Sequence, residues 1–179
     1  MKALLVDESA EGADVLREGL GEAGYDIAAS LAGARGMLHA VEAIKPDIVV
    51  IGTRSPSREV LEHVAALGQR MPRPVLMFAA DAAPQTIRKA MRAGVSAYIL
   101  DGLDRARVKG IVASAIGTFE ELQRLRQQLA ERKSVDRAKA ILMKNYRLDE
   151  EAAYAMLRRI AMERNQRIGE VAQRVIDGA

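Results

Sequence analysis

The residues of this chain best suited to chemistry are two neighbouring carboxylates, Asp7 and Glu8, which follow a short apolar run over residues 3–6. Such a run predicts a buried parallel strand, and functional groups gather where these strands end at the rim of a sheet. Carboxylate oxygens at that place suit a hard divalent cation. A second apolar run, "DIVVIG", ends at Gly52, which brings no nucleophile, ligand or acid to the same rim.

Other reactive residue types are scarce in the chain. It has no cysteine, which excludes disulfides, a thiolate nucleophile and a cysteine-based zinc site. The first apolar run is too short for a signal peptide or a membrane span. We therefore expect a cytoplasmic protein. Apart from the Asp7-Glu8 pair, where weak cation binding stays open, nothing in the chain predicts a metal site, a cofactor or an enzyme.

Basic residues gather in the last third of the chain. Residues 1–118 carry 14 Lys and Arg against 14 Asp and Glu, whereas residues 119–179 carry 13 against 10. The excess is sharpest over residues 121–147, with eight basic residues against three acidic ones. This charge predicts either a surface that binds a polyanion or a solvated helix face laced with charge.

The first 118 residues alternate short apolar runs with amphipathic segments. The apolar runs predict strands over residues 2–7, 25–30, 47–52, 74–80 and 96–100. The amphipathic segments predict helices over residues 10–22, 32–43, 57–69, 84–92 and 104–117. Five strand–helix repeats with short links indicate an α/β domain over residues 1–118, with a flavodoxin-like (CheY-like) doubly wound, five-stranded parallel sheet.

Beyond Thr118 the pattern predicts helices without strands. Residues 119–133 form a helical, coiled-coil-like linker, because apolar residues recur there every three or four positions, at Phe119, Leu122, Leu125 and Leu129. Such a narrow seam needs a partner: either a second copy of the chain in a homodimer through residues 119–129, or another part of the same chain if the helix folds back. Residues 134–179 predict a bundle with helices over 134–145, 150–164 and 167–177, the second capped by Asp149.

With these elements in place, residues 1–118 resemble the receiver domain of response regulators. The resemblance implies a magnesium-binding acidic pair after strand one, a phosphate-accepting aspartate ending strand three, a Ser or Thr ending strand four and a Lys-Pro pair ending strand five. This chain has instead Gly52 for the acceptor, Ala79 for the hydroxyl residue and Asp101-Gly102 for Lys-Pro. The resemblance therefore implies a pseudo-receiver that takes no phosphate, with a degenerate phospho-site at Asp7, Glu8, Gly52, Ala79 and Asp101.

The last 46 residues, which contain "RAKAILMKNYRLDEEAAYAMLRRIAMERNQRIGEVAQRVI", resemble the ANTAR domain, a three-helix RNA-binding module of transcription antiterminators. We expect the larger apolar residues of this segment to form the core of the bundle, namely Leu142, Met143, Leu157, Met162 and Val171. Tyr154 either stacks on a base or, slightly better supported, packs in that core.

The resemblance implies that exposed basic side chains of the first two bundle helices bind leader-RNA hairpins, since such groups neutralise phosphates and pair with loop bases. Small residues such as Ala138 and Ala140 would let the RNA approach closely. The candidate RNA-binding residues are Arg137, Lys139, Ala140, Lys144, Arg158, Arg159 and Arg164.

A receiver without its acceptor, with Ser-Pro-Ser-Arg (residues 55–58) after strand three and "GVSAYILDGL" at strand five, is similar to the NasT-type regulators of nitrate and nitrite assimilation. This similarity implies an antiterminator held inactive by a nitrate- or nitrite-sensing partner of the NasS type rather than switched by phosphorylation. Two alternatives remain open: a DNA-binding response regulator, and an adaptor whose bundle binds only protein. The first would need an acceptor aspartate and a more basic final helix than one with Arg167 and Arg174.

Overall fold

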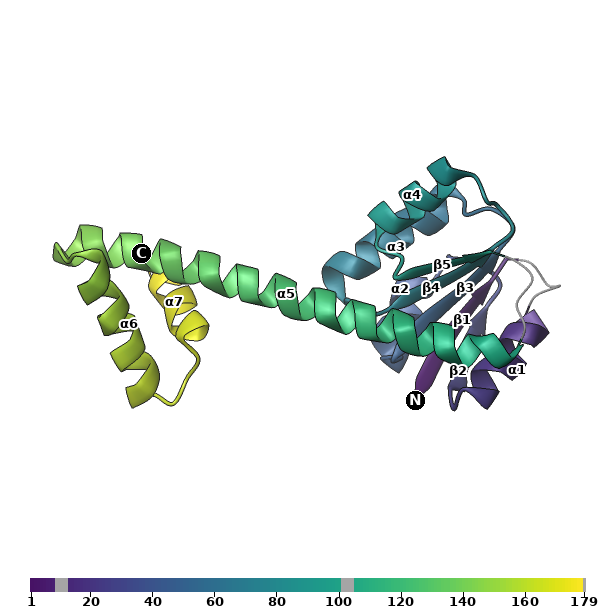
Figure 1. Cartoon of the computed structure of the whole chain (residues 1–179), viewed down its shortest axis with the longest axis horizontal. Coiled ribbons are helices and arrows are strands. Elements are labelled where there is room, and N and C mark those ends of the chain that lie inside the picture. Colours follow the sequence, from purple (N-terminus) through teal and green to yellow (C-terminus); the bar gives the residue numbers. More distant parts are fainter. Residues whose placement is uncertain (9–12, 101–104, 179) are drawn as a thin grey trace. The chain divides into compact units, whose positions relative to one another are not determined.

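The computed structural model describes residues 1–8, 13–100 and 105–178 and divides the chain into two compact units, Met1–Glu120 and Glu121–Ala179. The first unit is an α/β domain and the second is helical (Figure 1). The strands are β1 (Lys2–Asp7), β2 (Asp26–Leu31), β3 (Ile48–Thr53), β4 (Val75–Ala79) and β5 (Ala97–Leu100). The helices are α1 (Ala13–Glu22), α2 (Met37–Ile44), α3 (Arg58–Arg70), α4 (Pro84–Ala93), α5 (Arg105–Tyr146), α6 (Glu150–Glu163) and α7 (Ile168–Asp177).

The sheet of the first unit is parallel, with the strand order β2-β1-β3-β4-β5 of a flavodoxin-like fold. The sequence prediction of this fold is confirmed. Strands β1, β3 and β4 are apolar along nearly their whole length because both faces of the sheet are covered. One face packs on Leu16 and Leu20 of α1 and on Val108 and Val112 of α5. The other face packs on α2, α3 and α4.

Helix α5 is a single element of 42 residues. The sequence prediction of a separate helix beginning at residue 134 is therefore wrong, since that segment is the last part of α5. The physical reason is that no helix-stopping residue intervenes: the last proline of the chain is Pro84, and Gly110 and Gly117 each cost a helix only about 1 kcal/mol. The helix ends where Arg147 adopts a left-handed conformation with φ of 54°.

The core of the second unit consists mainly of small and branched apolar side chains from all three helices. Its buried residues are Ala138, Leu142, Ala153, Leu157, Ala161, Val171 and Ala172. Helix α6 begins as predicted at Asp149, whose Oδ1 accepts a hydrogen bond of 2.7 Å from the amide of Ala152. Burial of Leu142, Leu157 and Val171 is confirmed.

Three expectations about this core are wrong. Met143 and Met162, which were expected in the core, are 37% and 66% exposed. Tyr154, for which core packing was the favoured of two alternatives, is 46% exposed. Each of the three follows directly after a core residue, and one position along a helix turns a side chain by about 100°. Conversely, Ala138 is fully buried, so it cannot offer a close approach to RNA.

Helix α7 approaches α5 closely at Gly169. A Cβ atom at this position would lie 2.7 Å from Cγ of Glu131, closer than non-bonded carbon atoms approach one another. The absence of a side chain at Gly169 therefore lets the first turn of α7 rest on the Glu131 side chain.

This contact predicts a substitution whose effect changes sign with its background. Gly169→Ala should lower the free energy of unfolding of the bundle by about 1–2 kcal/mol, because the added methyl group overpacks the contact. In a Glu131→Ala background the same substitution should raise it by up to about 1 kcal/mol, because alanine favours the helix more than glycine does. Hydrogen exchange of α7 amides in the whole chain measures both effects. Stabilisation by Gly169→Ala in both backgrounds would contradict the close packing.

Candidate functional sites

The carboxyl ends of β1, β3 and β4 bring together most of the positions that the receiver resemblance implies. In the strand register Asp7 lies opposite Gly52, and Thr53 lies opposite Ala79. Asp101 lies outside the described residues. The rim therefore presents two carboxylates, a glycine and a buried alanine, with no nucleophile at position 52 and no hydroxyl at position 79.

The space that a side chain at position 52 would occupy is already constricted. A Cβ atom there would lie 3.1 Å from Oδ1 of Asp7 and 3.2 Å from Cδ1 of Leu16, tighter than ordinary van der Waals contact. The neighbouring carboxylate is engaged as well, because the buried Thr53 hydroxyl donates a hydrogen bond of 2.9 Å to Oε2 of Glu8. Oε2 of Glu8 thus accepts a hydrogen bond from the last residue of β3. The receiver resemblance instead implies a role for this carboxylate in binding magnesium. Among the described residues, no cluster of three or more His, Cys, Asp or Glu is arranged to hold a metal ion.

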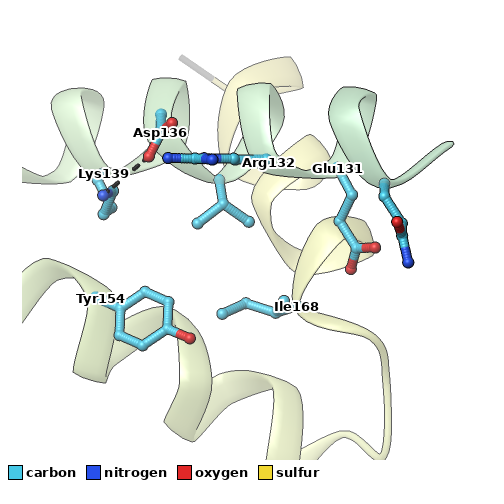
Figure 2. A pocket seen from close by; sticks show the side chains of 8 residues that line it. Glu131, Arg132, Asp136, Lys139, Tyr154 and Ile168 are labelled. Atoms are coloured by element: carbon cyan, nitrogen blue, oxygen red, sulfur yellow. Dashed lines mark ion pairs between the residues drawn. The ribbon is translucent and has the colours of Figure 1, made fainter. Parts of the chain in front are cut away.

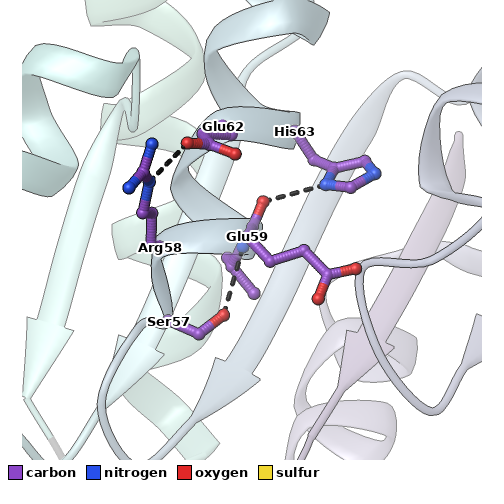
Figure 3. A network of polar contacts seen from close by, with 6 residues as sticks. Ser57, Arg58, Glu59, Glu62 and His63 are labelled. Carbon is purple, nitrogen blue, oxygen red and sulfur yellow. Dashed lines mark hydrogen bonds and ion pairs between the residues drawn. The ribbon is translucent and has the colours of Figure 1, made fainter.

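The segment that follows β3 serves to start a helix. Ser57 caps α3 by accepting a hydrogen bond of 3.2 Å from the amide of Val60 (Figure 3). Arg58 pairs with Glu62 one turn along at 2.6 Å, and Nδ1 of His63 lies 2.8 Å from the carbonyl oxygen of Glu59. Each of these polar groups has a local structural role on α3.

Asp81, just after β4, joins three neighbouring segments, a feature that the sequence analysis missed. Its carboxylate accepts hydrogen bonds from the Ala83 amide (2.9 Å) and from the hydroxyls of Ser55 (2.7 Å) and Thr86 (2.9 Å). Its backbone carbonyl accepts a bond of 2.8 Å from the Tyr98 hydroxyl on β5. The signal that could have revealed it is an aspartate three residues before the proline that opens α4, a typical Asx turn.

These bonds lower the pKa of Asp81, the Ala83 amide first and the two hydroxyls next. They fix the loop after β4 to the loop after β3 and to β5. The rim of this sheet is therefore held in place by hydrogen bonds within the protein, without a phosphoryl group.

The bundle carries a line of exposed basic residues on α5. Arg126, Lys133, Arg137 and Lys144 are spaced by seven, four and seven positions, which places them on one face of the helix, with Ala140 between the last two. We call these four basic residues the α5 basic stripe. Among the described residues, none of them takes part in an ion pair. The stripe contains two of the predicted RNA-binding positions, Arg137 and Lys144, and a third, Ala140, lies between them.

Lys139 lies on a different face of α5 and is only 16% exposed. Its Nζ atom lies 2.7 Å from Oε1 of Glu150 and 2.9 Å from Oδ1 of Asp136. These hydrogen bonds, Glu150 first, raise the pKa of Lys139. The side chain thus ties α5 to the first turn of α6, and its charge is already compensated.

The predicted basic residues of α6 are all exposed but differ in their partners. Arg159 lies 3.9 Å from Glu163, and Arg164 is the residue that ends the helix. Arg158 follows Tyr154 by one turn, so these two exposed side chains are neighbours on the helix surface. They supply an aromatic ring beside a cation.

Comparisons with known proteins agree with the two units. A family model described as the ANTAR domain matches residues 123–176. The first unit is similar in fold to a CheY-like response-regulator receiver domain from Methanospirillum hungatei, with a TM-score of 0.58 and 19% identity over 67% of this chain and 96% of that one.

Curated relatives are similar along most of the chain. The transcriptional regulatory protein PdtaR of Mycobacterium tuberculosis is 25% identical over 90% of this chain and 82% of that protein. The aliphatic amidase regulator of Pseudomonas aeruginosa is 30% identical over 73% of this chain and 71% of that protein. A nitrate regulatory protein of Klebsiella oxytoca is 39% identical over 56 residues, which are 31% of this chain and 14% of that protein.

The chain therefore belongs to the ANTAR-domain response regulators, and it resembles their NasT type. The members of this family are regulators rather than enzymes. Membership supports, at the level of the family, a role in RNA-binding antitermination. No helix among the described residues is both long and apolar enough to cross a membrane.

The Asp81 network predicts a pH-dependent contribution to stability. Because the pKa of Asp81 is lowered in the folded state, its contribution is present above the ordinary aspartate pKa of about 4 and is lost as the pH falls through the folded-state value. Asp81→Asn should therefore destabilise the protein at pH 7 and lose its effect at an acidic pH below the folded-state pKa of Asp81. Urea unfolding between these pH values tests this, with Asp26→Asn on the edge strand β2 as the control. An equal effect of Asp81→Asn at both pH values would contradict the assignment.

Proposed function

We propose that this protein is an RNA-binding transcription antiterminator that binds hairpins in leader mRNA and so prevents termination. The observation that carries the proposal is the α5 basic stripe, four exposed cations free of ion pairs among the described residues, in a segment that matches the ANTAR domain. Cations in a line along a helix can neutralise successive phosphates of a nucleic-acid backbone.

The candidate RNA-binding residues lie on two faces of the bundle: the α5 basic stripe with Ala140 is on the face of α5 turned away from the core residues Ala138 and Leu142, and Arg158, Arg159 and Arg164 are at the surface of α6. Among these residues, Arg137 and Lys144 are the best candidates for phosphate contacts, because they are exposed and lie beside the small Ala140. Lys139 contributes by holding α5 to α6, since two carboxylates already compensate its charge.

We further propose that a protein partner controls the output. The rim of the sheet offers no phosphate acceptor at position 52, so the receiver-like unit acts as a docking surface. The partner is a nitrate- or nitrite-sensing protein of the NasS type, and the target is a transcript of nitrate or nitrite assimilation in the cytoplasm. The similarity to a nitrate regulatory protein over 56 residues favours this pathway.

The two alternatives have less support. A DNA-binding response regulator needs an acceptor where Gly52 stands, and a helix-turn-helix whose final helix reads the major groove. If the bundle bound only protein, the uncompensated positive charge of the α5 basic stripe would have no role. RNA binding accounts for both features.

We also propose a parallel homodimer through α5. Leu122, Leu125 and Leu129 are exposed and follow the a, d, a spacing of a heptad. In a parallel, in-register pair, Glu121 at position g of one copy, which also pairs with Arg124 on its own helix, would face Arg126 at position e of the other, an attraction that an antiparallel pair would lack. In such a dimer Lys133, Arg137 and Lys144 of the stripe would stay uncompensated. The chemistry of the seam therefore favours a second copy of this chain.

RNA binding by the α5 basic stripe predicts a specific salt dependence. The logarithm of the affinity for a leader hairpin should fall linearly with the logarithm of salt concentration. Arg137→Ala together with Lys144→Ala should weaken binding and reduce the magnitude of that slope by about 2, because two phosphate contacts are lost. Fluorescence anisotropy over a series of KCl concentrations measures this.

The matched control is Lys89→Ala with Arg92→Ala on α4, which removes the same charge from the receiver-like unit and should leave the affinity unchanged. Circular dichroism should show equal helicity in both double variants. Hairpin binding that does not depend on salt would refute the phosphate-contact model.

The dimer predicts that one apolar side chain decides the oligomeric state. Leu125→Glu should convert a dimer into a monomer, because it places a charge at a d position of the seam. Gln127→Glu adds the same charge on the far side of the helix and should leave the dimer intact. Sedimentation velocity distinguishes these results. A monomeric wild-type protein, or a Leu125→Glu variant that remains a dimer, would exclude this seam as the interface.

A further inference from the structure

The bundle contains a pocket of about 380 Å³ bounded by α5, α6 and the first turn of α7. In Figure 2 the Tyr154 ring on α6 and the Ile168 side chain on α7 lie across from the α5 side chains. The volume falls within the usual range for small-ligand sites, about 300–1,000 Å³. Neither the receiver-like unit nor the α5 basic stripe contributes to it.

The apolar part of the pocket suits a flat ring. Tyr154 leaves nearly half of its surface exposed, and Val135 and Ile168 line the pocket with it. A tyrosine on a small bundle would ordinarily bury its ring in the core, as the neighbouring Ala153 and Leu157 bury their side chains. An exposed ring beside aliphatic groups offers a stacking surface for an aromatic ligand.

The charges of the pocket favour a neutral ligand over a phosphate. Its lining contains two acidic residues, Glu131 and Asp136, and two basic residues, Arg132 and Lys139, so the formal charges cancel. Asp136 and Lys139 also pair with each other at 2.9 Å. A phosphate would gain little in such a site, whereas a neutral base could use its hydrogen-bonding groups.

One carboxylate of the pocket is available for recognition. Glu131 forms no hydrogen bond or ion pair with the described residues, and Gly169 in the first turn of α7 lies directly against its side chain. An ionised carboxylate only accepts hydrogen bonds, so it selects a ligand with an amino group.

From these observations we infer that the pocket binds one unpaired base of the RNA loop, stacked on Tyr154, with its exocyclic amine donating a hydrogen bond to Glu131. The inference deepens the proposed function and depends on it, because the base belongs to the RNA hairpin that the bundle binds; the α5 basic stripe lies on the opposite face of α5 and is not part of this contact. Adenine, cytosine and guanine carry an exocyclic amine and uracil does not. Arg158, one turn beyond Tyr154, is placed to meet the phosphate next to the bound base.

The experiment uses the whole chain and two fluorescent RNA hairpins that share one paired stem and differ only in the loop, all adenine or all uracil. The wild-type protein should bind the adenine loop more tightly. Tyr154→Ala should weaken binding of the adenine loop by roughly 5- to 150-fold, which corresponds to the loss of about 1–3 kcal/mol for one stacked base. Tyr154→Phe retains the ring and should bind like the wild type.

Tyr146→Ala is the matched control, because it removes an exposed tyrosine of the same bundle that does not line the pocket. It should leave the affinity for both hairpins unchanged. Glu131→Gln should reduce the preference for adenine over uracil, because a neutral amide oxygen is a weaker acceptor than a carboxylate.

The outcomes separate this inference from the proposed function. If the wild-type protein binds neither these hairpins nor a leader hairpin, RNA binding itself is wrong and the pocket proposal falls with it; if it binds a leader hairpin but neither of these two, RNA binding stands and the base pocket is refuted. If the wild type binds both hairpins with salt-dependent affinity but Tyr154→Ala binds like the wild type, RNA binding stands and the base pocket is refuted. Equal loss with Tyr154→Phe and Tyr154→Ala would likewise refute stacking.

Discussion

The structure depends on the burial of helix α5 in two separate cores. Val108 and Val112 near its start pack on one face of the sheet, and Ala138 and Leu142 near its end form part of the helical bundle. No proline follows Pro84, so nothing in the sequence stops the helix between these two places. One element thus belongs to both the receiver-like unit and the ANTAR unit, and between the two cores its apolar residues Leu122, Leu125 and Leu129 remain exposed.

The rim of the sheet shows how a receiver fold persists without the residues of phosphoryl transfer. The strand register still places Asp7 beside position 52, yet glycine stands there and Thr53 has taken up a carboxylate oxygen of Glu8. The Asp81 network fixes the adjoining loops through the protein's own hydrogen bonds. We propose that this rim docks a partner protein.

The sequence predicted the parts of the structure that follow from local pattern. Strands buried on both faces appear as unbroken apolar runs, and Asp149 before two glutamates marks the start of α6. The pattern did not reveal which of two adjacent residues faces the bundle core, because helical spacing gives the period and tertiary packing decides the direction. Met143, Met162 and Tyr154 therefore proved exposed, while Ala138 proved buried. The sequence could reveal only one of the two partners of Lys139: Asp136 lies three positions earlier on the same helix, whereas the nearer partner, Glu150, lies on another helix. The same exposure of Tyr154 creates the pocket on which the base-binding inference rests.

The most direct test measures phosphorylation of the receiver-like unit and RNA binding by the bundle in one experiment. The affinity of the whole chain for a leader hairpin would be measured before and after incubation with acetyl phosphate and magnesium, and the mass of the protein recorded alongside. The account predicts RNA binding with the same affinity in both samples and no phosphoryl adduct, because the chain lacks the acceptor at position 52 and carries its RNA-binding surface on a separate unit. A stable phospho-adduct accompanied by a change in RNA affinity would contradict it.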